Sequence, residues 1–294
     1  MRFYSECIRQ GEFELRIIDY KEIQSAVKKL LLEANYYLSS DVLESLKKYE
    51  KIEISEIGKD MLCRIIENAE LAAEKQIAIC QDTGMSVIFA EIGQNVHIAG
   101  GSITDAINEG VRQAHRDGYL RKSVVEDPLN RKNTGDNTPA VIHYDIVDGE
   151  GIRLQVMPKG FGSENMSAIK MLKPSDGVEG VIDFVLQTVK NAGSNPCPPI
   201  IVGVGIGGTM EKAAFLSKKS LLRSLNEKNS NPYYAELEAL LLNRINNLGI
   251  GPQGLGGITT ALDVHIEYYP THIAGLPVAV NITCHAARHA EVVL

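Results

Sequence analysis

Three cysteines share one local setting in this chain, because each stands where an apolar run meets a turn or a helix start. Cys80 ends the run 76–80 and precedes a polar turn, Cys197 stands between prolines before a second apolar run, and Cys284 follows a third. Short apolar runs are typical of buried strands, and α/β proteins place their chemistry at strand ends. We therefore predict that the three thiolates meet and hold one metal centre.

Hydrophobic periodicity predicts a helical N-terminal part followed by strands and helices in alternation. Apolar residues three and four apart indicate helices over 21–38, 41–51 and 55–75. We expect strands at 85–92, 140–147, 152–157, 199–205, 263–269 and 277–282, besides the run 76–80. The fold class is then α/β (mixed α+β), a mixed central sheet with surrounding helices. We expect one domain over 1–294, in which a mostly helical layer, 1–75, covers a cluster-binding core, 76–294.

Some local signals give sharper expectations. The segments 140–147 and 152–157 alternate apolar with polar residues and are joined by Asp148-Gly-Glu-Gly151, which predicts a β-hairpin. A final helix is expected from about Cys284 onward. The polar segment 119–138 has no periodicity, and loops of that length are often functional.

Two glycine-rich segments have several interpretations. Gly203-Val-Gly-Ile-Gly-Gly208 matches a dinucleotide-binding pattern, but the acidic residue expected about 20 positions later is missing. The plainer interpretation is a close backbone approach and a helix N-terminus directed at an anion. The segment 249–257 lacks the Lys-Ser/Thr ending of a P-loop, and we expect a tight loop near the site.

Composition narrows the classes of partner. The 294 residues carry a net charge of −7 and no basic tract, so nucleic acid is not an expected partner. No apolar run reaches the roughly 18 residues of a membrane span, and residues 1–7 have no signal-peptide core. We expect a cytoplasmic protein without a membrane partner.

The cysteine count favours thiol or metal chemistry over disulfides. Five cysteines are an odd and sparse set for a reducing compartment. Cys63 lies on the apolar face of a helical pattern and is expected to pack in the core, whereas Cys7 carries no signal. The other three are either ordinary buried thiols or ligands, and their long separations match no zinc ribbon or ferredoxin pattern. Three thiolates could hold a [4Fe-4S] cluster with one iron open to act as a Lewis acid.

Several motifs in a fixed order resemble a known family over nearly the whole chain after the first helices. These motifs are Cys80-Gln-Asp-Thr-Gly84, Gly162-Ser-Glu-Asn-Met166, Asn195-Pro-Cys-Pro-Pro-Ile-Ile-Val-Gly203, Gly205-Ile-Gly-Gly-Thr209, Leu255-Gly-Gly-Ile-Thr-Thr-Ala-Leu262 and Thr271-His-Ile-Ala-Gly-Leu-Pro-Val278. The sequence resembles the α subunit, or N-terminal half, of class I iron–sulfur fumarate hydratases and the related L-tartrate dehydratases.

The resemblance implies a role for each candidate residue. It implies that a [4Fe-4S] cluster is held by Cys80, Cys197 and Cys284. Asp82 and His272 would be catalytic and would hydrogen-bond the leaving hydroxyl. A second set would bind the substrate carboxylates: Gln81, Arg121 and Gly162.

The resemblance also implies the reaction and a partner. We expect a hydro-lyase α subunit that hydrates fumarate to L-malate reversibly, or else dehydrates L-tartrate. Single-chain relatives continue into a second half, so the chain should need a separate β subunit, in an α2β2 assembly, that supplies the general base. The rival interpretation is a zinc-binding or non-catalytic partner subunit that uses the same cysteines.

Overall fold

The computed structural model describes residues 15–294, so Cys7 lies outside the described residues. The helices are α1 Tyr20–Tyr36, α2 Ser40–Ile52, α3 Glu56–Lys75, α4 Ile103–Asp117, α5 Phe161–Glu164, α6 Gly177–Ala192, α7 Met210–Lys219 and α8 Pro232–Asn246. The strands are β1 Arg16–Asp19, β2 Met85–Gly93, β3 Val96–Ala99, β4 Val141–Val147, β5 Ile152–Lys159, β6 Ala168–Leu172, β7 Ile200–Gly207, β8 Ala261–Tyr269, β9 Leu276–Thr283 and β10 Ala290–Val293.

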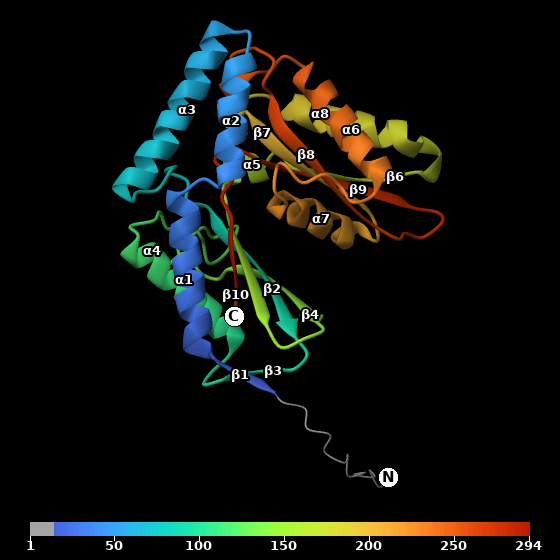
Figure 1. Cartoon of the computed structure of the whole chain (residues 1–294). Helices are drawn as coiled ribbons and strands as arrows, with labels where there is room; N and C mark the ends of the chain where they lie inside the picture. The colour runs from blue at the N-terminus through green and yellow to red at the C-terminus, as the bar shows by residue number, and fades with distance from the viewer. Residues whose placement is uncertain (1–14) are drawn as a thin grey trace.

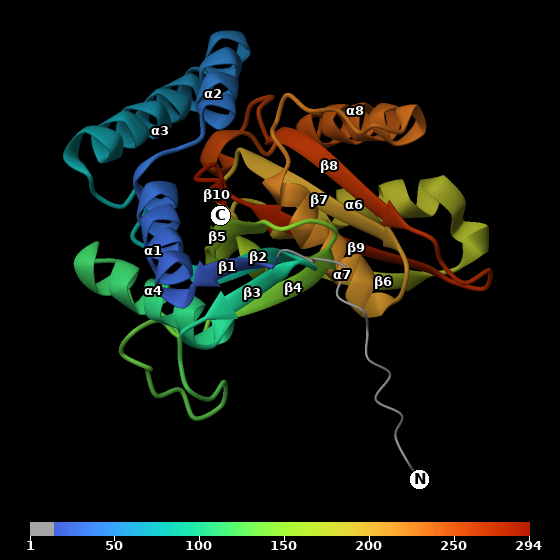
Figure 2. The same cartoon turned by 60° about the horizontal axis from the view of Figure 1, so that its bottom comes forward.

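Two four-stranded mixed sheets form the body of the molecule, where we expected one central sheet. Their strand orders are β10-β5-β2-β4 and β6-β9-β7-β8, and β1 pairs with β3 in a small third sheet. Each large sheet has one parallel pair, β2–β4 or β7–β8, beside antiparallel pairs. Helices α1 and α4 pack beside the first sheet, α6 and α8 cover the second, and α7 lies between the two (Figures 1 and 2). The mixed α/β class is confirmed.

The helical N-terminal layer is also present, and it covers both sheets. Buried side chains of α2 and α3, among them Leu46 and Leu62, share one apolar cluster with Val87 and Phe89 of the first sheet and Ile201 of the second. Each sheet has a further core of its own. The place where α2 and α3 meet the two sheets is therefore a packed junction.

Four local expectations were wrong. Strands β4 and β5 do not pair as a hairpin, because β2 lies between them, parallel to β4 and antiparallel to β5. The run 76–80 is not a strand; Gln76 takes a left-handed conformation that ends α3. The chain end forms β10, which pairs with β5, where a helix was expected. Cys63 is exposed on α3, because the buried face of that helix passes through Leu62 and Ile65.

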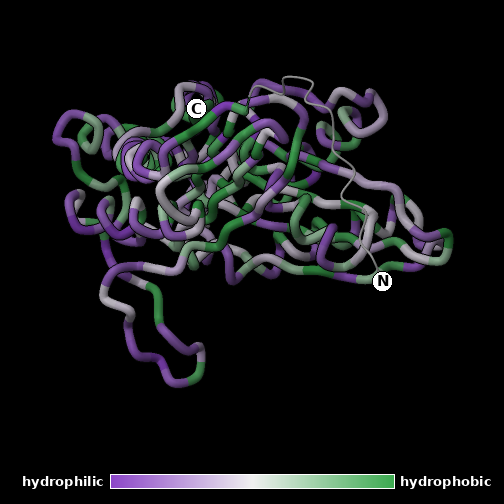
Figure 3. Tube along the Cα trace, turned by 90° about the horizontal axis from the view of Figure 1, so that it is seen from below, coloured by the Kyte–Doolittle hydropathy of each residue, from purple (hydrophilic) through white to green (hydrophobic). Residues whose placement is uncertain are grey.

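The loop after α4, residues 118–140, projects from the body (Figure 2). Coloured by hydropathy, the trace shows a long projecting loop that is mostly hydrophilic (Figure 3). The exposed backbone of such a loop is solvated by water. Among residues 15–294, no helix combines the length and the apolar character that crossing a bilayer requires.

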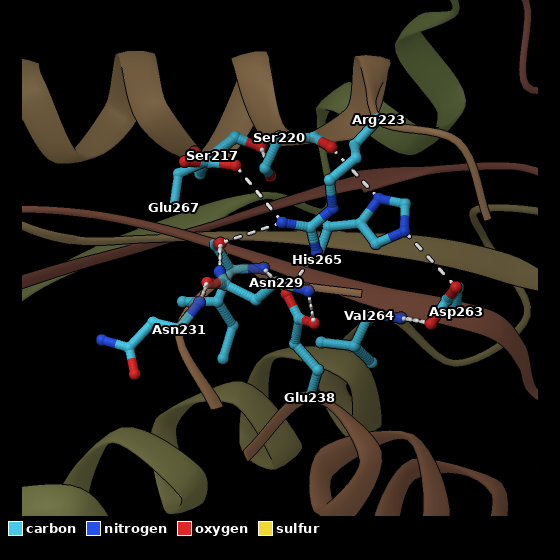
Figure 4. A network of polar contacts seen from close by, with 11 residues as sticks. Ser217, Ser220, Arg223, Asn229, Asn231, Glu238, Asp263, Val264, His265 and Glu267 are labelled. Carbon is cyan, nitrogen blue, oxygen red and sulfur yellow. Dashed lines mark hydrogen bonds and ion pairs between the residues drawn. The ribbon is translucent and has the colours of Figure 1, made fainter. Parts of the chain in front are cut away.

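A buried ion pair fixes α8 to the edge strand of the second sheet. Arg223 and Glu238 form a close ion pair, and both side chains are about nine-tenths buried. Glu238 also accepts the N–H of Ile266 at 2.7 Å and that of Asn229 at 3.2 Å, and Arg223 reaches Glu267 on β8 (Figure 4). These bonds tie the 223–231 segment and helix α8 to β8, the edge strand of the second sheet.

Glu53, which follows α2, joins the helical layer to the loop before β8. Its carboxylate accepts the N–H groups of Ile54 and Ser55 beside it and those of Ile258 and Thr259 across the interface, at 2.8 to 3.1 Å. Burial alone would raise the pKa of Glu53, but these hydrogen bonds outweigh it and lower the pKa. One carboxylate therefore satisfies backbone donors of two elements.

We predict that Glu53→Ala lowers the free energy of unfolding by about 2–4 kcal/mol, because buried N–H groups lose their acceptor. Glu53→Gln should cost less, since an amide oxygen remains. The control is Glu56→Ala, whose side chain is 89% exposed in the next helix and should change stability by under about 0.5 kcal/mol. Urea unfolding measures all three; equal effects of Glu53→Ala and Glu56→Ala would contradict this role.

Candidate active site at three converging loops

The turn after Cys80 is held against the end of β5 by Asp82. Its carboxylate accepts the N–H of Gly84 at 3.0 Å and the N–H of Phe161 at 2.9 Å. Gly84 has φ +78°, and a Cβ there would lie 2.7 Å from the backbone nitrogen of Lys159, so the position requires glycine. Asp82 is thus a turn cap, and it also fixes where the 160–166 segment meets the turn.

Cys197 stands in a strained loop directly before β7. It is a non-glycine residue with φ 54°, a conformation that is uncommon and gathers at functional sites. The His285 ring hydrogen-bonds the Cys197 carbonyl at 2.9 Å, and Gln253, in the glycine-rich loop, donates to the Pro198 carbonyl at 2.8 Å. The loop expected near the site is therefore in contact with two of the cysteine segments.

Cys284 follows β9 and meets the segment that carries Cys80. Ile79 and Ala286 pack together in a small buried cluster with Ala72, and Cys284 packs on it. The N–H of Ile79 is also bonded to the carbonyl of Asn35 at 2.9 Å. The three cysteine loops are thus joined through their neighbours.

The thiols themselves are close enough to influence one another. Burial raises the pKa of Cys197, and the charges of Cys284 and Cys80 raise it further. Burial likewise raises the pKa of Cys284, while the Arg288 guanidinium, the Ala286 N–H and the Lys159 ammonium act in the opposite direction. Without a bound metal the protons therefore stay on these two sulfurs, and metal binding would release them.

The donor set fits a cluster better than a single ion. Within residues 15–294, no three His, Cys, Asp or Glu groups gather as closely as one metal ion requires. In a cubane cluster each cysteine binds a different iron, so the sulfurs lie farther apart than the ligands of one ion. Three thiols in neighbouring loops, with the buried cations Arg288 and Lys159 near Cys284, fit a cluster of this kind.

A cavity of about 560 Å³ lies on the Asp82 side of these loops. Such a volume is suitable for a small molecule. Asp82, Phe161 and Asn165 line it together with residues of the projecting loop, including Val124 and Arg131. Arg131 is the arginine in this lining, a position that the motifs did not indicate.

The other three residues expected near the substrate lie around this site. Gln81 is exposed beside Cys80, and its side-chain oxygen is 3.4 Å from that sulfur. Arg121 is exposed, and its carbonyl accepts the Thr83 hydroxyl at 3.0 Å, which ties the projecting loop to the turn. A Cβ added at Gly162 would lie 3.6 Å from the carbonyl of Asn195, so this residue faces the Cys197 loop.

His272 is not brought to this site within one chain. It is exposed in the loop between β8 and β9, whereas Cys284 follows the other end of β9. At about 3.3 Å per residue, the eight residues of β9 separate the two ends by about 23 Å. His272 lines a second, larger cavity of about 940 Å³ together with Glu91 and Lys212, and this lining includes none of the three cysteines and not Asp82.

Sequence reasoning missed two buried residues that support the turn. The neutral His115 ring hydrogen-bonds the Val111 carbonyl and the Asn137 amide, both at 2.9 Å. Asn137 in turn donates to the Gly84 carbonyl at 3.1 Å and accepts the Ser123 N–H at 2.7 Å. A histidine at the end of a helix and an asparagine in a polar loop carry no local signal for such a contact.

Comparison with known proteins agrees with this picture. The family model described as fumarate hydratase (Fumerase) matches residues 24–293. The chain is 48% identical over 275 residues to a Methanocaldococcus jannaschii protein provisionally named L(+)-tartrate dehydratase subunit alpha, with 92% of this chain and 96% of that protein covered. It is 36% identical over 275 residues to the L(+)-tartrate dehydratase subunit alpha of Escherichia coli and of Shigella sonnei, with 90% of each chain covered.

A lyase that adds or removes water is the class that these comparisons define. The chain belongs to the fumarate hydratase family. The resemblance and the hydro-lyase prediction are therefore confirmed.

We predict that stability falls as the pH drops below about 6.5, partly through His115. Burial lowers the pKa of His115, with nearby Lys122 acting in the same direction and the Val111 carbonyl and Asp136 against it. A lowered folded-state pKa means that the contribution is present above 6.5 and is lost as the pH falls through the folded value. The difference between the urea unfolding midpoints at pH 7.5 and pH 5.5 should therefore be smaller for His115→Gln than for the wild type.

Burial also lowers the pKa of His143, His285 and His289. The stability of the His115→Gln variant should therefore still depend partly on pH. At pH 7.5 the substitution should cost about 1–3 kcal/mol, since His115 bridges two elements. The same midpoint difference in the variant and the wild type would contradict the role given to His115.

Proposed function

We propose that this chain is the α subunit of a hydro-lyase and carries a [4Fe-4S] cluster on Cys80, Cys197 and Cys284. The observation that carries the proposal is the meeting of the three cysteine loops: the His285 ring bonds the Cys197 carbonyl, Cys284 packs with Ile79, and Asp82 caps the turn after Cys80. When bound, such a cluster would supply a Lewis-acidic iron that polarises a substrate hydroxyl. We further propose a four-carbon hydroxy-dicarboxylate as the substrate.

The chain's own residues would bind and orient this substrate. The guanidinium groups of Arg121 and Arg131 lie on the projecting loop, and a planar guanidinium suits a carboxylate in a bidentate pair. The Gln81 amide and the backbone near Gly162 would add hydrogen bonds. Asp82 would accept a hydrogen bond from the leaving hydroxyl and orient it, because the turn fixes its carboxylate at the cavity wall, and the proton that leaves with the hydroxyl would come from the His272 ring.

His272 fits the same proposal if a second copy of the chain supplies it. Its loop lies at the end of β9 that is opposite to the end near Cys197 and Cys284. The neighbouring Ile273 is 91% exposed. An exposed isoleucine beside a functional histidine suits a loop that docks on another chain. The α2β2 assembly would place the two α chains so that each loop reaches its partner's Asp82.

Two substrates are candidates. Hydration of fumarate to L-malate follows the family description, and dehydration of L-tartrate follows the names of the full-length relatives. Those names also contain the term subunit alpha, which supports a β subunit as the partner. We propose that the β subunit provides the general base, and that the complex is cytoplasmic with neither nucleic acid nor membrane as a partner.

We predict that Cys197→Ser abolishes retention of iron and sulfide after anaerobic purification and leaves the fold intact. The reason is that each cysteine would hold a separate iron. The matched control is Cys63→Ser, an exposed thiol on α3, which should keep the brown colour and full iron. The wild-type chain, assayed with its β subunit under argon, should dehydrate L-malate or L-tartrate.

Two results would contradict the proposal. Full iron and sulfide in Cys197→Ser would remove the ligand assignment. A colourless wild-type chain with stoichiometric zinc would favour the rival function as a zinc-binding subunit.

The contribution of His272 from a second chain is tested by mixing two inactive variants. Asp82→Asn and His272→Gln should each lose at least about 100-fold in kcat. Co-expressed with the β subunit, the two variants should recover about a quarter of the wild-type activity, because half of random α pairs are mixed and each mixed pair has one intact site. Activity no higher than that of either variant alone would exclude this arrangement.

A further inference from the structure

Arg288 is a buried cation with hydrogen-bond donors to spare. It is 4% exposed, and its Nη1 donates to the Asn35 side chain at 3.2 Å. Its Nε is buried and has no acceptor among the described residues. A guanidinium has five N–H donors, and a buried donor without a partner is costly. Such a group in a native fold calls for a functional explanation.

The guanidinium faces the cysteine site. Arg288 follows Cys284 by four residues, and Ala286 and Ala287 between them are buried. A Cβ added at Gly160 would lie 3.4 Å from Arg288 Nη2 and 3.2 Å from Asp82 Oδ2. The side chain thus lies between the Cys284 loop and the Asp82 turn, next to Gly160.

A second buried cation, Lys159, differs in one decisive respect. Its ammonium is 2% exposed and bonds the Ser163 hydroxyl at 3.0 Å, the Ile282 carbonyl at 2.8 Å and the Glu164 carboxylate at 3.2 Å. An ammonium has three donors, so Lys159 has used all of its own. Of these two cations beside Cys284, Arg288 is the one that can still donate.

The position of Arg288 favours sulfur over a substrate carboxylate as its acceptor. The substrate-sized cavity is lined by Asp82, Phe161 and the projecting loop, and Arg288 is not part of that lining. A three-thiolate cluster is an anion overall, because the thiolates outweigh the positive charge of an oxidised cubane core. The Cys284 sulfur is an acceptor of this kind, and the Arg288 charge is close enough to it to lower the pKa of the thiol against the effect of burial.

We propose that Arg288 is a positioning residue of the metal centre: its guanidinium N–H groups hydrogen-bond the sulfur atoms at Cys284, and its charge offsets that of the cluster. This inference rests on the proposed function. Hydrogen bonds and positive charge at the sulfurs stabilise the more reduced cluster and raise its reduction potential. Without Arg288 the cluster should be easier to oxidise and to lose.

The test compares Arg288→Gln, Arg288→Lys and Asn35→Ala in the full chain, each reconstituted anaerobically with iron and sulfide. Arg288→Gln should bleach in air about tenfold faster than the wild type and bind the cluster about tenfold more weakly. Arg288→Lys keeps the positive charge, so its bleaching rate and cluster affinity should lie between those of the wild type and those of Arg288→Gln. Asn35→Ala removes the hydrogen bond that Arg288 makes to the Asn35 side chain, the one it has among residues 15–294, and should retain its cluster nearly as the wild type does. Urea unfolding of the apo chains separates effects on the fold.

The outcomes are distinct. Wild-type iron, sulfide and bleaching rate in Arg288→Gln would overturn the inference, and so would an Asn35→Ala variant that loses its cluster as fast, because Arg288 would then act only as a structural tie. A wild-type chain that takes up no iron–sulfur centre would overturn the proposed function itself.

Discussion

Bringing three cysteine loops together puts thiols where burial and their mutual charge oppose ionisation, and this is the constraint on which the candidate site depends. Burial is the main cause of the raised pKa values of Cys197 and Cys284, and the charges of Cys284 and Cys80 raise the pKa of Cys197 further. The fold overcomes this with contacts that leave the sulfurs out. The His285 ring, the Asn35 carbonyl and the Asp82 carboxylate join the loops through backbone groups. Positive charge from buried side chains then favours the anionic state that a metal needs.

The two-sheet architecture explains why the site can form from such distant residues. Cys197 precedes β7 and Cys284 follows its antiparallel neighbour β9, so both lie at the same end of these two strands. The turn after Cys80 leads into β2 of the first sheet. The candidate site therefore lies where the two sheets and the helical layer meet. His272 lies at the other end of the strands of the second sheet.

Local patterns predicted what local forces decide. Helices α1, α2 and α3 follow from their apolar spacing, and Cys197 and Cys284 lie where the expected strands β7 and β9 begin and end, but the run before Cys80, expected as a strand, is not one. What the patterns missed depends on distant partners: β2 lies between β4 and β5, and β10 pairs with β5 in place of the expected helix. The supporting contacts of Asn137 and Arg288 are equally non-local. The family resemblance indicated His272, but a motif does not say where in the fold its loop lies, and this loop is at the end of β9 away from Cys284.

We propose that Cys80, Cys197 and Cys284 hold one cluster in which one iron has no cysteine ligand. Mössbauer spectroscopy of the anaerobically loaded chain tests this most directly. We predict a cubane spectrum in which one iron site differs from the others and responds when L-malate or L-tartrate is added to the complex with the β subunit. Four equivalent irons that ignore both acids, or iron without a cluster spectrum, would contradict the account.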